Sequence, residues 1–296
     1  MFRSPLQAAP EPCRPGLVVL DFDGTLTDAD AHAAAFHEAS RRELARWLRW
    51  DEATLRREWQ RARTAVAGLP PSAAWIVDGA GVCPATADPY LIANSVAKLL
   101  LAEHDPTLAG AALTAAVLEI HHAAYRRVPP PFRPEARVVL EGLCRRGYHL
   151  RVVTNSQTTS VSQQLDSLSF RGRAQVAVRG DAGKFAVCGA ATIDARFESL
   201  PERMDWPEVG RPVLLRRGRY FDLLRAIWDE TGTGPESTLV VGDVFELDLA
   251  MPAALGTHVH LAMRASTMPL ESQLARRLAR GDADPRLSAI LERIRA

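Results

Sequence analysis

Two carboxylates stand one residue apart at the end of a short apolar run, in the sequence Leu17-Val-Val-Leu-Asp21-Phe-Asp23-Gly-Thr25. The apolar run is typical of a buried strand. Burial alone does not explain the two acids, because an unpaired carboxylate is costly to remove from water. A divalent cation with oxygen ligands, such as Mg²⁺, would offset that cost. One acid could then act as a nucleophile and the other as a proton donor. The alternative interpretation is a strand end followed by an Asp-Gly turn.

Polar residues also follow two later apolar runs. Thr154-Asn155-Ser156 ends the run that begins at His149, and Gly242-Asp243 ends the run Thr238–Gly242, with Asp248 five residues further on. Each has a simpler interpretation, as a helix N-cap or as a turn residue. In an open parallel sheet, however, ligands bind beyond the carboxyl ends of the strands. We therefore expect these polar residues to converge on one site.

The order of these residues resembles the haloacid dehalogenase (HAD) superfamily, whose members are mostly Mg²⁺-dependent phosphohydrolases. Asp21-x-Asp23-Gly-Thr25 resembles motif I of the superfamily, and Thr154 resembles the threonine of motif II. Asp243 and Asp248 resemble motif IV. The three motifs cover the catalytic edge of the core and imply that the chain is an enzyme.

The resemblance implies catalytic roles for the carboxylates. Asp21 is expected to attack phosphorus and form an aspartyl-phosphate. Asp23 is expected to protonate the leaving alkoxide and then to activate the hydrolytic water. Asp21, Asp243 and the main-chain carbonyl of Asp23 are expected to ligate Mg²⁺, while Asp248 orients its water shell. Dehalogenases of the superfamily lack the second motif I aspartate, so Asp23 favours a phosphate ester substrate.

The remaining motif residues are expected to bind the phosphoryl group. The Thr154 hydroxyl and the Asn155 amide would donate to phosphoryl oxygens, and Thr25 would order the turn and help to position Asp23.

The motif III cation is the weakest part of the resemblance, because two sequence segments could supply it. Lys184 follows Gly180-Asp-Ala-Gly, a pattern that the superfamily also uses, but no proline or helix follows it. Arg217 and Arg219 precede a predicted helix at roughly the spacing that the superfamily has, although arginine is not equivalent to lysine as a point charge. We favour Lys184, with Arg217 or Arg219 as the alternatives.

Strands that alternate with helices predict an α/β fold, a doubly wound parallel sheet with the Rossmann-like core of the superfamily. The predicted strands are Leu17–Asp21, His149–Thr154, Ala174–Val178, Thr238–Gly242 and His258–Ala262. The predicted core helices are Glu135–Arg146 and Tyr220–Glu230. Short strands are also predicted at 186–190 and at 212–215, and two amphipathic helices at 269–296, whose role is open.

A helical block of about 100 residues interrupts the predicted core after its first strand, which is too long for a loop. Its helices are expected from about Phe36 to Trp59, from Pro89 to Glu103 and from Leu108 to Arg127. The predicted organisation is a flexible leader at 1–16, a core at 17–28 and 134–296, and a helical cap at 29–133 of the kind that the superfamily calls C1.

The cap would close over the site and select the substrate. The arginines and tryptophans between Arg41 and Arg63 suggest either recognition of the leaving group or, as we prefer, a solvated Arg/Glu face with a tryptophan core. The turn Asp78-Gly-Ala-Gly81 is a candidate specificity loop. The histidines of this block (His32, His37, His121 and His122) are expected on helix surfaces or in packing.

The composition of the 296 residues bounds the partners and the compartment. The formal charge of +1 gives no electrostatic reason to expect nucleic acid or membrane binding. The four cysteines form no Cys-x-x-Cys pair, so we expect neither a zinc site nor disulfides. Reduced cysteines are typical of cytoplasmic proteins, so we expect a cytoplasmic location. We expect a monomer or homodimer that acts on a small-molecule phosphate ester. The alternatives are a phosphomutase acting on a sugar phosphate and a non-catalytic protein that binds a phosphorylated ligand.

Overall fold

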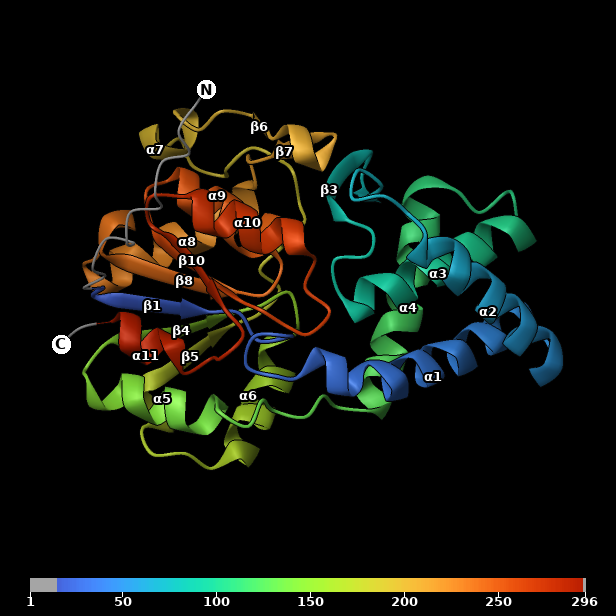
Figure 1. Cartoon of the computed structure of the whole chain (residues 1–296), viewed down its shortest axis with the longest axis horizontal. Coiled ribbons are helices and arrows are strands. Elements are labelled where there is room, and N and C mark those ends of the chain that lie inside the picture. Colours follow the sequence, from blue (N-terminus) through green and yellow to red (C-terminus); the bar gives the residue numbers. More distant parts are fainter. Residues whose placement is uncertain (1–14, 295–296) are drawn as a thin grey trace, which may run out of the picture.

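A six-stranded parallel sheet forms the centre of the molecule, in a computed structural model that describes residues 15–294. The strand order is β10-β9-β8-β1-β4-β5. These strands are β1 at Leu17–Leu20, β4 at His149–Val153, β5 at Val176–Arg179, β8 at Thr238–Gly242, β9 at His258–Ala262 and β10 at Gly281–Asp284. β1 pairs with both β4 and β8, so the first strand lies near the middle (Figure 1). The predicted leader lies outside the described residues, apart from its last two.

Helices cover both faces of this sheet. One face packs on α5 (Ala136–Arg145), α6 (Thr158–Leu168) and α11 (Ala289–Arg293), and the other on α8 (Gly218–Thr231), α9 (Ala250–Ala254) and α10 (Pro269–Arg277). Successive side chains of a strand point to opposite faces, so Val18 and Leu20 join one apolar cluster while Leu17 and Val19 join the other. The doubly wound α/β architecture predicted from the sequence is therefore confirmed.

Two predictions for the later part of the chain were wrong in detail. The tail is not simply two helices, because β10 (Gly281–Asp284) lies between α10 and α11 and extends the sheet beside β9. Residues 186–190 form no strand beyond a single bridge from Cys188 to Arg217. The predicted strand at 212–215 is present as β7 (Pro212–Leu214), but its partner is β6 (Arg203–Asp205).

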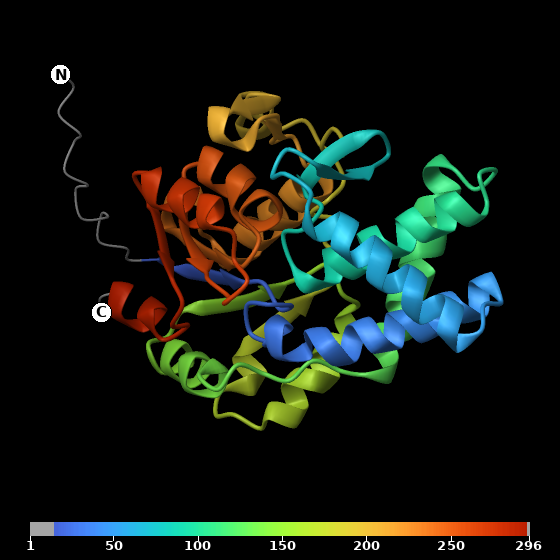
Figure 2. The ribbon, with the colours of Figure 1, turned by 45° about the vertical axis from the view of Figure 1, so that its right-hand side comes forward.

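Residues 29–127 form a second group of elements beside the carboxyl edge of the sheet (Figures 1 and 2). The group comprises α1 (Ala29–Leu48), α2 (Glu52–Ala67), α3 (Pro89–His104), α4 (Gly110–Arg127) and the antiparallel hairpin of β2 (Ala74–Val77) and β3 (Ala80–Pro84). A hydrophobic cluster formed mainly by its own residues holds the group together, and Val244 of the core joins this cluster. None of the helices described is long and apolar enough to cross a bilayer.

The sequence predicted neither the hairpin nor the break in the first helical stretch. α1 ends where Arg49 adopts a left-handed conformation (φ 51°), and α2 begins after Asp51, whose carboxylate caps the Thr54 amide. The hairpin turns at Asp78 and Gly79, which both have positive φ (48° and 80°) as a tight two-residue turn requires.

The chain passes between the two groups twice, and the two passages pair with each other. Thr27 forms an antiparallel bridge with Phe132, and the Asp28 amide donates to the Pro131 carbonyl. Arg133 ties this junction to the core, because its guanidinium donates to the Gly24 carbonyl and to carbonyls at the end of β9. The division into a core and a cap at 28/29 and 133/134 stays a prediction.

Candidate active site

Three carboxylates from two neighbouring strands meet at the carboxyl edge of the sheet. Asp21 follows β1, and Asp243 follows β8 directly, while Asp248 lies one turn later in the short helix η4 (Phe245–Leu249). One oxygen from each carboxylate lies within 4.8 Å of the others, and all three residues are buried. The structure therefore brings together the acids that the sequence places more than 200 positions apart.

Two glycines permit this close approach. Gly24 has φ of 81°, and a Cβ placed on it would lie 2.1 Å from Oδ2 of Asp243. A Cβ on Gly242 would lie 2.2 Å from Cβ of Asp248. Real Cβ atoms do not approach other atoms this closely, so a side chain at either position would push the carboxylates apart.

Lys184 lies among these carboxylates. Its Nζ donates to Oδ1 of Asp21 at 2.6 Å and to Oδ1 of Asp248 at 2.7 Å, and the residue is 1% exposed. Burial by itself would lower the pKa of Lys184, but the charges of Asp21 and Asp248 outweigh burial and raise it. The lysine is therefore charged and touches the expected nucleophile.

The two alternative cations lie elsewhere. Arg217 is fully buried and donates to the backbone carbonyls of Lys184 and Val82, each at 2.6 Å. It holds the Lys184 segment and the hairpin together, so its guanidinium is not free to bind phosphate, contrary to our expectation. Arg219 is exposed and lines the rim of a cavity described below.

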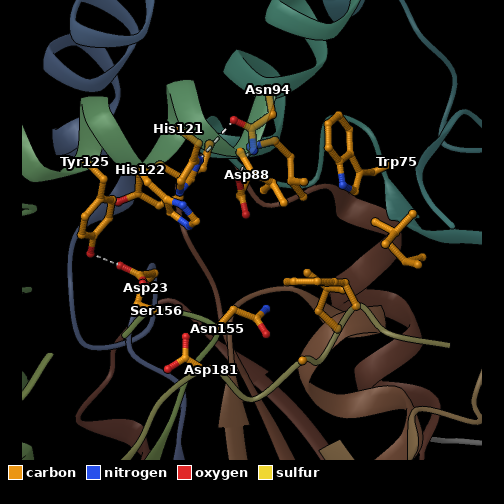
Figure 3. A pocket seen from close by; sticks show the side chains of 18 of the residues that line it. Asp23, Trp75, Asp88, Asn94, His121, His122, Tyr125, Asn155, Ser156 and Asp181 are labelled. Carbon is orange, nitrogen blue, oxygen red and sulfur yellow. Dashed lines mark hydrogen bonds between the residues drawn. The ribbon is translucent and has the colours of Figure 1, made fainter. Parts of the chain in front are cut away.

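Asp23 accepts hydrogen bonds on both carboxylate oxygens. Ser156 Oγ donates to Oδ2 at 2.7 Å, and the Tyr125 hydroxyl from α4 donates to Oδ1 (Figure 3). Burial raises the pKa of Asp23, although both hydrogen bonds oppose the shift because they stabilise the ionised form. A carboxyl with a raised pKa is suited to proton transfer near neutral pH. Ser156 belongs to the polar residues that we expected to converge here, although no role was assigned to it, whereas no sequence pattern indicated Tyr125.

The predicted phosphate-binding residues are only partly placed as expected. Thr154 Oγ1 accepts from the Ser156 amide at 3.0 Å and lies 3.5 Å from Oδ2 of Asp23. Oδ1 of Asn155 accepts from the Lys184 amide at 2.9 Å, so Asn155 also positions the lysine.

The turn after Asp23 is ordered by a residue other than the one we expected. Thr25 is fully buried, and its hydroxyl has no hydrogen-bond partner. Thr27 orders the turn instead, because its Oγ1 accepts from the Gly24 amide and donates to the Phe22 carbonyl.

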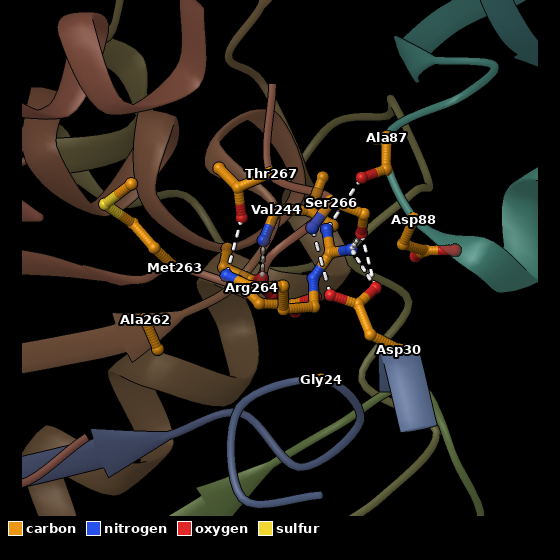
Figure 4. Close-up of polar contacts among 12 residues, drawn as sticks. Gly24, Asp30, Ala87, Asp88, Val244, Ala262, Met263, Arg264, Ser266 and Thr267 are labelled. Carbon is orange, nitrogen blue, oxygen red and sulfur yellow. Dashed lines mark hydrogen bonds and ion pairs between the residues drawn. The ribbon is translucent and has the colours of Figure 1, made fainter. Parts of the chain in front are cut away.

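Arg264 is a second buried cation at this edge, and sequence reasoning missed it. Its Nε pairs with Oδ2 of Asp243 at 2.6 Å, and its Nη2 donates to the Ala87 carbonyl at 2.6 Å (Figure 4). Ser266, which accepts from Arg264, also donates to Asp30 at the start of α1. This network links a candidate metal ligand directly to the group 29–127.

The donor set fits a divalent cation. Asp21, Asp243 and Asp248 supply hard oxygen ligands, and among the described residues Lys184 and Arg264 form ion pairs with them. Burial raises the pKa of Asp21 well above its usual value and that of Asp243 to about 7, despite the opposing cations. A further cation would therefore stabilise the ionised carboxylates.

A cavity of about 370 Å³ opens beside these residues, between the sheet edge and the helices α3 and α4 (Figure 3). Asp23, Asn155 and Ser156 form its core side. Asp21 is 7% exposed and does not line the cavity. A phosphoryl group therefore reaches Asp21 only if contacts between residues 29–127 and the core loosen.

The arginine-rich helices α1 and α2 contribute none of the residues that line this cavity. Their arginines pair with Glu38, Glu43, Glu52, Glu58 and Glu103, which fits the solvated face that we preferred. Of their tryptophans, Trp59 is buried in the apolar cluster of this group, and Trp47 is 45% exposed.

The four histidines divide into two pairs. His32 is buried against Tyr90, and His37 lies 2.8 Å from the Pro89 carbonyl, as expected for packing residues. His121 and His122 line the cavity, which the sequence did not indicate.

The chain belongs to the haloacid dehalogenase-like hydrolase family, whose model matches residues 15–256. A structure described as a predicted phosphoglycolate phosphatase from Haemophilus somnus 129pt has a TM-score of 0.53 at 16% identity and covers 94% of this chain and 96% of its own. A predicted phosphatase from Clostridium acetobutylicum has a TM-score of 0.50 at 12% identity, with 94% and 97% covered. Such identities establish a common fold and nothing about the substrate. The chain has no significant match among curated proteins.

Proposed function

We propose that this protein is a Mg²⁺-dependent phosphatase that hydrolyses a small-molecule phosphate monoester through an aspartyl-phosphate on Asp21. The observation that carries the proposal is the different placement of the two acids. Asp21 lies in the buried carboxylate cluster with Asp243 and Asp248 and is ion-paired with Lys184, whereas Asp23 lines the cavity. A cation held by the cluster would keep the nucleophile ionised, and the cavity places the acid beside the leaving group.

In the first step, Asp21 attacks phosphorus and the bond from phosphorus to the ester oxygen breaks. Lys184 holds the nucleophile and neutralises charge on the phosphoryl group, while Thr154 and Asn155 supply donors near its oxygens. Asp23 gives its proton to the departing oxygen. In the second step, the Asp23 carboxylate takes a proton from water, which attacks phosphorus and releases inorganic phosphate and free Asp21.

Asp21, Asp243, Asp248 and the Asp23 carbonyl would hold the Mg²⁺. When bound, the ion supplies positive charge that keeps Asp21 ionised and offsets charge on the phosphoryl oxygens. Arg264 fixes the orientation of Asp243 through its pair with Oδ2, which leaves Oδ1 of the same carboxylate for the cation.

Residues 29–133 would act as a cap over this site. Their contacts with the core include four polar ones, Tyr125 to Asp23, Ala87 and Asp30 to the Arg264 network, and Val82 to Arg217. Val244 of the core also packs into their hydrophobic cluster. Such contacts can break and re-form as the cap opens to admit the ester and closes to exclude water.

Asp23 favours phosphate ester hydrolysis over dehalogenation. A halide leaves without a proton, so a dehalogenase would have no use for an acid held by two hydrogen bonds at the cavity wall. An alkoxide leaving group needs such a proton.

Phosphate release from a panel of metabolite phosphate esters tests the proposal, with Mg²⁺ and then with EDTA. We expect turnover with Mg²⁺, loss of turnover with EDTA, and no turnover by the Asp21→Asn variant under either condition. A wild-type protein that releases phosphate from no ester would contradict the proposal, and so would release of halide from a haloacid.

A further inference from the structure

The cavity extends well beyond the place that a phosphoryl group would fill. It runs from Asp23 and Ser156 on the core side to Trp75 in the hairpin at its far end (Figure 3). Its volume of about 370 Å³ is within the range of pockets that hold ring-containing ligands. A two-carbon leaving group would leave most of it unfilled.

The walls of this outer part are apolar and aromatic. Trp75 is 5% exposed and Tyr90 6%, and the remaining apolar lining includes Leu91, Leu118 and Phe185. Aromatic side chains of this kind pack against flat rings in stacked or edge-to-face arrangements. A chain of hydroxyls would gain little from such walls.

The polar groups inside the cavity carry no positive charge. Nδ1 of His121 donates to Oδ1 of Asn94, 3.1 Å away, and burial lowers the pKa of His121 to about 3, so this imidazole is neutral near pH 7. His122 also lines the cavity but is exposed to solvent, and partial burial of its ring lowers its pKa. The Asp88 carboxylate, which caps α3 through the Leu91 amide, also lines the cavity.

The cations of the cavity lie only at its rim. Arg126 and Arg219 line the opening, and both are exposed to solvent. A carboxylate on the leaving group would therefore lose its water without gaining a buried cation, and it would face Asp88. A hydroxyl or amine hydrogen would instead find acceptors in Asp88 and in the neutral imidazole of His121.

From these observations we propose that the substrate is a monoester of an uncharged, ring-bearing alcohol. The proposal rests on the proposed phosphatase function, because it concerns the leaving group of that reaction. It excludes short anionic esters such as phosphoglycolate as good substrates.

The test compares phenethyl phosphate with phosphoglycolate, using the full-length wild-type protein and Mg²⁺. Both esters release an alkyl alcohol, so the comparison reports on the cavity more than on leaving-group chemistry. We expect kcat/KM for phenethyl phosphate to be at least about tenfold higher. Equal or better hydrolysis of phosphoglycolate would overturn this inference and leave the phosphatase proposal standing. Hydrolysis of no ester at all would instead refute the phosphatase proposal.

A pair of tryptophan variants locates the effect within the cavity. Trp75→Ala should lower kcat/KM about tenfold more for phenethyl phosphate than for methyl phosphate, because only the larger ester reaches the hairpin. Trp47→Ala is the matched control, since Trp47 is 45% exposed on α1 and does not line the cavity. Equal losses with both esters, or no loss with Trp75→Ala, would contradict the inference.

Discussion

Replacing Lys184 with methionine removes the buried charge that touches the expected nucleophile while keeping a similar side-chain volume. The ammonium lies 2.6 Å from Asp21 and 2.7 Å from Asp248, and nothing else described at this position can replace its charge. Arg217 is held by two carbonyls, and Arg219 is exposed. Loss of one preorganised donor to a developing charge lowers kcat by about 10² to 10³, which corresponds to roughly 3–4 kcal/mol. We expect a loss of that size for Lys184→Met.

The assay is steady-state phosphate release at saturating ester, together with a titration of Mg²⁺. Because Lys184 repels a cation that binds beside it, the variant should bind Mg²⁺ at least as tightly as the wild type while kcat falls. The exposed Arg56→Met serves as a control for general effects of removing a positive charge. Near-normal kcat in Lys184→Met would refute the reasoning, and a large loss in Arg219→Met would then assign the phosphate charge to Arg219.

Three further predictions concern residues around the site. Tyr125→Phe removes a hydrogen bond that stabilises the ionised form of Asp23, so the pKa of Asp23 should rise. The alkaline limb of the pH–rate profile should then move to higher pH. A limb that does not move would argue against the hydrogen bond from Tyr125 to Asp23. Arg264→Met leaves Asp243 buried without its partner, which should destabilise the fold by about 3–5 kcal/mol. Added Mg²⁺ should restore part of the lost melting temperature, because the ion would bind the same carboxylate. A loss of melting temperature that Mg²⁺ does not reduce would argue against binding of both Arg264 and Mg²⁺ to Asp243. Burial raises the pKa of Glu271 from 4.5 to about 8, so between these pH values the folded state holds a proton that the unfolded state has lost. The free energy of unfolding should therefore fall by a few kcal/mol between about pH 5 and 8. Urea titrations of Glu271→Gln should show no such fall, and an unchanged pH dependence would contradict the assignment.

The sheet could be predicted because its inner strands are short apolar runs that must be buried on both faces. The strand predicted at Thr238–Gly242 agrees with the structure, and the one predicted at Leu17–Asp21 is a single residue longer than the observed Leu17–Leu20. The edge strand Gly281–Asp284 could not be predicted, because it alternates small and acidic residues, which are not typical of strands. It forms only because β9 offers an unpaired edge.

The hairpin at Ala74–Pro84 was missed for a different reason. It lies in a stretch whose flanks are strongly helical, and strands of four and five residues give little periodicity of their own. The turn signal Asp78-Gly79 was recognised but was not joined to the strands beside it.

Some residues of the candidate site could likewise be predicted from the sequence and others could not. The acids could be found because they directly follow predicted strands, and Lys184 because lysine is scarce in this chain. Tyr125 comes from a helix about 100 positions away from Asp23, and no local pattern marks it. Arg264 could have been found, since it lies two residues after the predicted strand His258–Ala262 and therefore at the same edge of the sheet.

The most direct measurement of the central claim is the detection of a phosphoryl group on Asp21. The Asp23→Asn variant should be mixed with p-nitrophenyl phosphate and Mg²⁺, quenched with acid and mapped by peptide mass spectrometry. The nitrophenolate leaves without an acid, whereas hydrolysis of the intermediate lacks its base, so the intermediate should accumulate. We expect the phosphoryl group on the peptide that contains Asp21 and its absence from the doubly substituted Asp21→Asn, Asp23→Asn protein. Release of nitrophenol with no modification of Asp21, or with modification of another residue, would contradict the account.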